Sequence, residues 1–220
     1  MTPNSIRFAS RRLRGSDVSA TTSGVRGEGR GALRRVPGEP GIWVFVILDM
    51  LIFAEMFGIY GWYRADNYEA FHAAQAEVIP AFGLAYTVIL LSSSWMVVLA
   101  ISAARRGELD LSDKLARGGL ALGVSFAVLK LIEYGTKLSQ GITPLTNDFF
   151  MFFFVMTFVH LLHASVGIGV LVYMRRRIRT LSPGAASDSK RVGVIETCGI
   201  YWHMVDLLWI VLFALFYLRG

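Results

Sequence analysis

The chain has 220 residues, of which 54% are hydrophobic and only 17% are charged. A soluble domain of this length carries more charge, so the composition argues against a soluble enzyme and favours a protein that crosses a membrane several times. The net charge of +6 does not indicate nucleic-acid binding, because the basic residues lie in the N-terminal tail and in loops, where they set membrane orientation.

The first segment, residues 1–37, contains eight arginines separated mainly by glycine, serine and threonine. It has no apolar stretch of the kind that a secretory signal needs. The sequence therefore predicts a disordered, arginine-rich cytoplasmic tail, followed by a membrane domain over residues 38–220.

Long apolar stretches divide the membrane domain. A helix needs roughly 20 mostly apolar residues to cross a bilayer. We expect five such helices, at about residues 41–63, 81–103, 117–136, 149–173 and 198–218. Each stretch is too long for an ordinary strand, and bacterial barrels have an even number of strands. The predicted fold class is therefore all-α, a polytopic membrane protein with five transmembrane helices.

Lysines and arginines are distributed unequally between the two sides of these helices. Eighteen lie in the tail and near the loops after the second and fourth spans, whereas three lie on the other side. The positive-inside rule then places the N-terminus in the cytoplasm and the C-terminus outside.

Several ionisable side chains fall inside or beside the expected spans. At a helix centre each costs ~2.5–3.5 kcal/mol unless it is paired or neutralised. We interpret them, with one tryptophan, as an intramembrane polar network with a structural, lipid-related or proton-related role: Asp49, Glu55, Lys130, Glu133, His160, His163, Glu196, His203, Asp206 and Trp209.

Depth in the membrane, counted at about 1.5 Å per residue, indicates which of these groups can meet. Glu55 and Lys130 lie at the same depth, and we predict an ion pair between them that joins the first and third spans. Glu133 is an alternative partner for Lys130, and snorkelling of the lysine toward the outer surface is another possibility. No lysine or arginine in a span lies at the depth of Asp49, so we expect a protonated or hydrogen-bonded acid there.

His160 and His163 share one helix face because they are three positions apart. Imidazole is a common metal ligand. Only one further histidine, His203, lies in a span, so a hydrogen-bonded packing network is favoured over a metal site. By depth, His160 can meet Asp206 and His163 can meet His203. The single cysteine, Cys198, can form no internal disulfide and is predicted to be a buried free thiol.

The aromatic side chains have structural interpretations. At the start of the fourth span we expect lipid contact or an interfacial belt for Phe149, Phe150, Phe152, Phe153 and Phe154. Trp202, Asp206 and Trp209 recur at i, i+4 and i+7, and this stripe is predicted to face a neighbouring helix.

Four blocks of the chain resemble the cytochrome c oxidase subunit III family of the haem–copper oxidases. They are the acid-containing run 44–54, the dipeptide Glu133-Tyr134, the H-x-x-H of residues 160–163, and the stretch 196–209 with the string YWHxVDxxW. The blocks occur in the order of the family and cover about residues 38–220. Five spans match the short bacterial form.

Some residues depart from the oxidase pattern of this family. Glu55 and Lys130 stand where that pattern has no charge. Residues 39–45 and 143–151 look more like the branch encoded with bacterial nitric oxide reductases. The departures leave the branch open.

The resemblance implies a non-catalytic subunit III of a haem–copper terminal respiratory oxidase in the bacterial cell membrane. Such a subunit packs beside the catalytic subunit I, with subunit II in the same complex. It binds phospholipid between helix groups and stabilises the catalytic subunit and its proton uptake. The chain would then belong to an oxidoreductase and translocase complex of the aerobic electron transport chain.

The residues themselves argue against a redox centre in this chain. Only three histidines lie in spans, and the chain has neither a two-cysteine copper site nor a C-x-x-C-H haem motif. We therefore assign no catalytic, cofactor-binding or metal-binding residue, and expect haem and copper, or haem and non-haem iron, in partner subunits. One alternative is an accessory subunit of bacterial nitric oxide reductase. A different class is a small transporter or channel that uses the membrane carboxylates.

Overall fold

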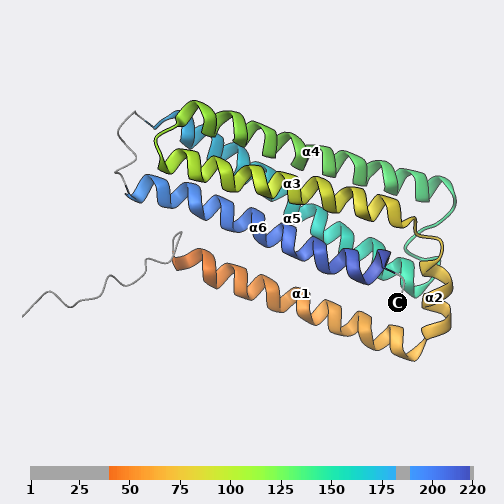
Figure 1. The fold of residues 1–220 in the computed structure, drawn as a ribbon. Coiled ribbons are helices and arrows are strands. Elements are labelled where there is room, and N and C mark those ends of the chain that lie inside the picture. The colour runs from red at the N-terminus through yellow and green to blue at the C-terminus, as the bar shows by residue number, and fades with distance from the viewer. Residues whose placement is uncertain (1–39, 182–188, 219–220) are drawn as a thin grey trace, which may run out of the picture. The chain divides into compact units, whose positions relative to one another are not determined.

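The computed structural model describes residues 40–181 and 189–218, and the side chains of residues 41–181 and 192–218. Every regular element in these ranges is a helix, which confirms the all-α fold class (Figure 1). The elements are α1 (Pro40–Asp66), α2 (Tyr68–Gln75), α3 (Pro80–Arg105), α4 (Leu109–Ser139), α5 (Asp148–Arg179) and α6 (Ser189–Tyr217). The predicted disordered tail over residues 1–37 lies outside the described residues.

Five of the described helices are long and apolar enough to cross a membrane, which confirms the five expected spans. They are Gly41–Asp66, Pro80–Arg105, Leu109–Ser139, Asp148–Arg179 and Val192–Tyr217. Some extend well beyond the apolar stretches, since α4 begins at Leu109 and α5 continues to Arg179. Charged residues interrupt the apolar pattern at these ends without ending the helix, because lysine, arginine and glutamate are good helix formers.

A short helix, α2, lies between the first two spans, where only a break was predicted from the sequence. Its Phe71 and Gln75 are buried. The Gln75 side-chain amide donates a hydrogen bond to the backbone carbonyl of Leu218 at 2.8 Å. This bond holds α2 against the end of α6.

Local signals in the sequence explain where the helices begin and end. Pro80 stands in the first turn of α3, where its fixed φ suits the helix and its missing N–H is not needed. Asn147 caps α5, because its side-chain oxygen accepts a hydrogen bond from the backbone N–H of Phe150 at 2.9 Å. Gly107 and Gly141 follow α3 and α4 with φ near +79°, a conformation that favours glycine.

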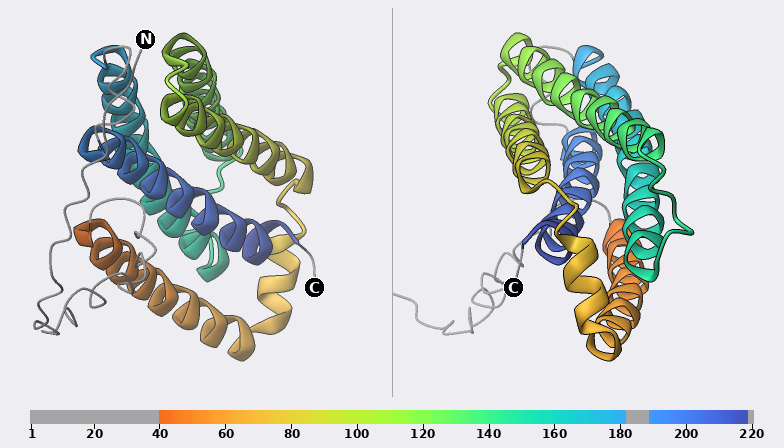
Figure 2. Two further views of the ribbon diagram at one scale, coloured as in Figure 1. Left: turned by 60° about the vertical axis from the view of Figure 1, so that its left-hand side comes forward. Right: turned by 90° about the vertical axis from the view of Figure 1, so that its right-hand side faces the viewer.

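Helices α3 to α6 form a closed ring. Helix α3 packs against α4 and α6, and α5 packs against the same two helices. Helix α1 lies beside α5 and α6 on the outside of this ring (Figure 2). The start of α1 and the end of α6 lie at opposite ends of the bundle, as an odd number of spans requires (Figure 1).

The tryptophans of α6 are in the interior, as predicted for the stripe Trp202, Asp206 and Trp209. Both tryptophans are fully buried, and Asp206 is nearly so. The Trp202 ring fits against Gly123 of α4 and Gly167 of α5, where an added Cβ would lie 2.7 Å and 2.8 Å from ring atoms. The two glycines therefore allow α4, α5 and α6 to enclose the indole.

The phenylalanines at the start of α5 lie in the interior of the fold. The expected lipid contact or interfacial belt is wrong, because four of the five are buried: Phe149, Phe150, Phe153 and Phe154. Phe152 is partly buried and packs edge-on against Tyr60 and Tyr63 of α1. Helices α2 and α6 cover this end of α5, and the sequence alone could not reveal α2 as a cover.

Candidate functional site

A buried lysine and a buried glutamate form the centre of the polar network. The Lys130 ammonium is 0% exposed and donates hydrogen bonds to Glu133 Oε2 at 2.7 Å and to the Tyr217 hydroxyl at 3.0 Å. That hydroxyl in turn donates to Glu133 Oε1 at 3.0 Å. The three groups form a closed triangle that joins α4 to α6.

Aromatic rings complete the surroundings of this ammonium. Its nitrogen lies 4.7–5.6 Å from the centroids of five rings: Tyr86, Tyr134, Phe153, Trp209 and Tyr217. Rings at this distance attract a cation through their quadrupole. The carboxylate of Glu133, the Tyr217 hydroxyl and these rings together offset the cost of a positive charge in hydrocarbon.

This arrangement decides between the expected partners of Lys130. The predicted ion pair between Glu55 and Lys130 is wrong, and so is snorkelling, because the ammonium is buried against Glu133. The Glu133 alternative is confirmed. Glu55 is exposed on α1, which packs beside α5 and α6. Equal depth could not reveal that the two side chains face different directions.

A second polar contact joins α1 to α5. Asp49 Oδ1 lies 3.1 Å from His163 Nε2, which confirms the expected hydrogen bond of this acid. His163 Nδ1 lies 2.8 Å from the carbonyl oxygen of Val159. Because a carbonyl oxygen only accepts, Nδ1 carries the hydrogen of that bond. The contact with Asp49 then holds another proton, on either the imidazole or the carboxyl group.

The other histidines have different surroundings. His160 is buried between the rings of Phe126 and Trp209, and in the described part of the chain neither of its ring nitrogens has a hydrogen-bond partner. His203 Nδ1 lies 2.5 Å from the hydroxyl of Ser94 on α3. The pairings of His160 with Asp206 and of His163 with His203, which equal depth allowed, are therefore not formed.

Further hydrogen bonds fasten the helices of the ring to one another. The Trp209 indole N–H donates to the Thr87 hydroxyl at 3.1 Å. The Ser93 hydroxyl donates to the carbonyl oxygen of Gly119 at 2.7 Å. Within residues 40–181 and 189–218, no three His, Cys, Asp or Glu side chains are grouped so that they could hold a metal ion. The polar network therefore attaches neighbouring helices to one another.

Ion pairs cluster where α3 and α5 end, a region we call the basic end and define by Arg105, Arg106, Arg175, Arg176, Arg177 and Arg179. Arg105 pairs with Glu196 of α6 at 2.9 Å. Arg175 Nε lies 2.9 Å from Asp113 Oδ1. Asp113 was not among the residues predicted from the sequence, although Arg117 four positions later was a signal for an acid–base pair on α4.

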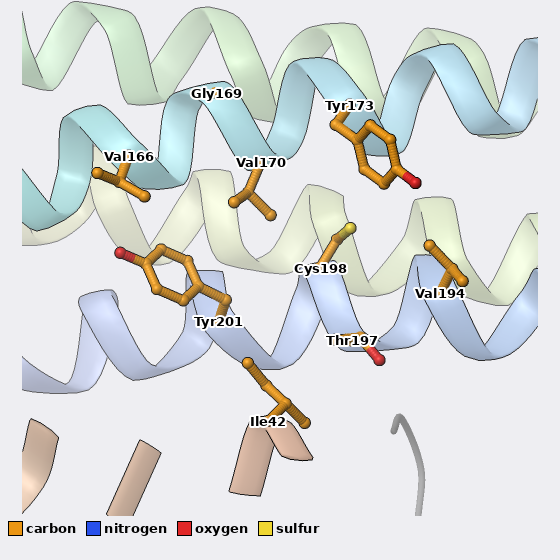
Figure 3. A pocket seen from close by; sticks show the side chains of 9 residues that line it. All are labelled: Ile42, Val166, Gly169, Val170, Tyr173, Val194, Thr197, Cys198 and Tyr201. Atoms are coloured by element: carbon orange, nitrogen blue, oxygen red, sulfur yellow. The ribbon is translucent and has the colours of Figure 1, made fainter. Parts of the chain in front are cut away.

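A hollow of about 510 Å³ opens between α5, α6 and the start of α1 (Figure 3). Its lining is mostly apolar and consists of Ile42, Val166, Gly169, Val170, Tyr173, Val194, Thr197, Cys198 and Tyr201. Cys198 is a buried free thiol, as predicted. We call this hollow the α1 cleft. Its apolar walls suit a hydrocarbon chain better than a polar substrate.

Fold and network together define a polytopic helical membrane protein whose buried polar groups mainly hold its spans together. Comparison with known proteins gives the particular family. The family model described as cytochrome c oxidase subunit III matches residues 38–220. The chain belongs to this family.

Relatives in the family serve different oxidases. The chain is 33% identical over 178 residues to cytochrome c oxidase subunit 3 of Thermostichus vulcanus, covering 81% of this chain and 85% of the relative. It is 32% identical over 182 residues to the Synechocystis protein of the same name, covering 81% and 74%. It is 25% identical over 180 residues to cytochrome bo(3) ubiquinol oxidase subunit 3 of Pseudomonas aeruginosa, covering 82% and 84%.

The comparisons decide between the alternative functions. This chain is a subunit III of the haem–copper oxidase type, which implies a membrane protein associated with other oxidase subunits. The nitric oxide reductase alternative is not supported, since these relatives are named for cytochrome c and quinol oxidases. Family membership also displaces the transporter or channel alternative.

Proposed function

We propose that this chain stabilises the catalytic subunit I of a terminal respiratory oxidase in the bacterial plasma membrane, with subunit II in the same complex. Haem and copper belong to those partner subunits. The proposal rests on the contacts that the charged groups make inside the membrane spans. Lys130 pairs with Glu133, and Asp49 pairs with His163. These groups therefore hold the helices of the bundle together.

We further propose that the α1 cleft holds a phospholipid. Its apolar lining fits an acyl chain. At the basic end the Arg177 guanidinium donates a hydrogen bond to the hydroxyl of Tyr173, a lining residue, at 2.8 Å. A phosphate at this mouth would meet a cation that is already positioned.

The arginines of the basic end also support an orientation for the bundle. The N-terminus is cytoplasmic and the C-terminus external, because the basic end collects arginines that the positive-inside rule assigns to the cytoplasm. A periplasm-active reporter fused after Gly220 should be active. Activity at this position of a reporter that works only in the cytoplasm would contradict this orientation.

The test of the main proposal is purification through an affinity tag on this chain from mild detergent. We expect a co-purifying subunit with two haems and copper, seen by absorption spectra and metal analysis. A complex prepared from cells without this chain should turn over initially and lose activity sooner. Recovery of the chain free of any haem-bearing partner would contradict the proposal.

A further inference from the structure

Glu55 lies within the apolar stretch of α1 and faces away from the rest of the fold. Phe53, which contacts the His163 ring, is two residues earlier and therefore about 160° around the helix. Glu55 is exposed, and no hydrogen bond or ion pair reaches it from the residues that the structure describes. Membrane spans hold such an acid when it faces protein or water and has a partner.

Exposed residues around Glu55 form a regular seam along α1. They follow one another at intervals of four and three residues: Val44, Leu48, Leu51, Glu55, Gly58 and Trp62. Helices that pair with a left-handed crossing use this spacing, and a polar residue within it fixes their register. A Cβ added to Gly58 would have no atom within 4 Å, so another backbone can approach closely there.

Helix α4 shows that the spacing alone does not indicate a partner. Its exposed residues include a seam with the same intervals and a glycine whose added Cβ would also be free of contacts: Val124, Val128, Leu131, Gly135 and Leu138. This seam has no ionisable residue and can face lipid without penalty. The carboxyl group of Glu55 is the difference between the two seams.

We propose that the α1 seam docks a transmembrane helix of another oxidase subunit, and that this helix brings a cationic or N–H donor to Glu55. The inference rests on the proposed function, which supplies such a subunit. A second copy of this chain fits less well, because a symmetric pairing would place Glu55 against Glu55. Acyl chains of lipid have no donor for the acid.

Photo-crosslinking in the intact oxidase complex tests which molecule covers the seam. A benzoylphenylalanine side chain replaces Ile59, an exposed side chain beside the seam, or, as the matched control, Ile132 beside the seam of α4. We expect a dominant product between position 59 and another oxidase subunit, and mainly lipid adducts from position 132. Lipid adducts alone at position 59, or a product with twice the mass of this chain, would overturn the proposal.

Two substitutions of the acid test the donor. Glu55→Leu would leave the partner's donor unpaired, so the amount of this chain retained in the solubilised complex should fall about tenfold or more. Glu55→Gln still accepts a hydrogen bond and should lose less. If Glu55 faces lipid instead, Glu55→Leu is neutral or favourable, and retention equal to wild type would overturn the proposal.

The outcomes separate this inference from the proposed function. If the wild-type chain carries no haem-bearing subunit through purification, the proposed function fails. If that subunit is present and the Glu55→Leu chain is retained like wild type, only the docking seam is wrong. Thermal unfolding of each isolated variant is the folding control, and it should not change because Glu55 is exposed in the isolated chain.

Discussion

The α3–α6 ring and helix α1 differ in where their charged residues lie. In the ring, Lys130 and Glu133 are buried and bond each other. In α1, Asp49 reaches across to His163, whereas Glu55 faces outward. In the most apolar part of α1, 11% of the residues are buried, against 56% in the most apolar part of α6. The ring is thus complete within this chain, while α1 presents a surface that an assembly can cover.

The largest effect should come from breaking the buried pair of the ring. Lys130→Met leaves the Glu133 carboxyl without its cation and should lower the free energy of unfolding by ~3–5 kcal/mol. The double variant Lys130→Met/Glu133→Leu replaces both charges by apolar groups and should recover most of this loss. Unfolding midpoints in detergent measure both. A double variant as unstable as the sum of the single variants would mean that the two residues act independently.

The glycines around Trp202 should come next. Gly123→Ala and Gly167→Ala each push a Cβ to within 3 Å of the indole, and overpacking of this kind costs ~1–3 kcal/mol. Gly135→Ala on the exposed face of α4 is the matched control, and it should be neutral or gain up to ~1 kcal/mol from helix propensity. Equal unfolding midpoints for the three variants would show that the indole moves aside without loss.

A smaller effect is expected where α1 joins the ring. Asp49→Asn keeps a hydrogen-bonding group beside His163 and should weaken the attachment by about 1 kcal/mol, whereas Asp49→Leu leaves the imidazole without its partner and should cost ~1–3 kcal/mol. The strength of the attachment is measured by the protease sensitivity of α1 and by the amount of this chain recovered in the complex. If Asp49→Asn assembles fully and the oxidase still turns over slowly, the shared proton has a role beyond structure.

The smallest effect should come from the exposed loop between α3 and α4. The Arg106 guanidinium bonds the carboxyl of Glu108 at 3.0 Å and holds the pKa of that carboxyl below its usual range. A lowered pKa contributes stability above the carboxyl pKa of the unfolded chain, and the contribution disappears as the pH falls. Both groups are fully exposed, so Glu108→Gln should leave the unfolding midpoint unchanged at pH 7. A clear shift would mean that the exposed ion pair stabilises the fold measurably despite its contact with solvent.

The sequence predicted the network in part. Asp49 was expected to be hydrogen-bonded, and it is, but its partner His163 was not identified. Glu133 was only an alternative partner for Lys130, and Tyr217 was missed. Tyrosines and serines carry no charge that would mark them in an apolar stretch, so Tyr217 and Ser94 could not be recognised before the helices were packed.

The sequence by itself determined the number of spans, their helical nature and the family, because apolar length and motif order are properties of the chain in one dimension. It also set the depth of each polar group. Tertiary structure alone decided the direction in which each group faces, because that depends on how neighbouring helices pack and rotate. Lys130 therefore bonds Glu133 instead of Glu55 at the same depth, and the phenylalanines of α5 lie under α2 and α6 instead of in lipid.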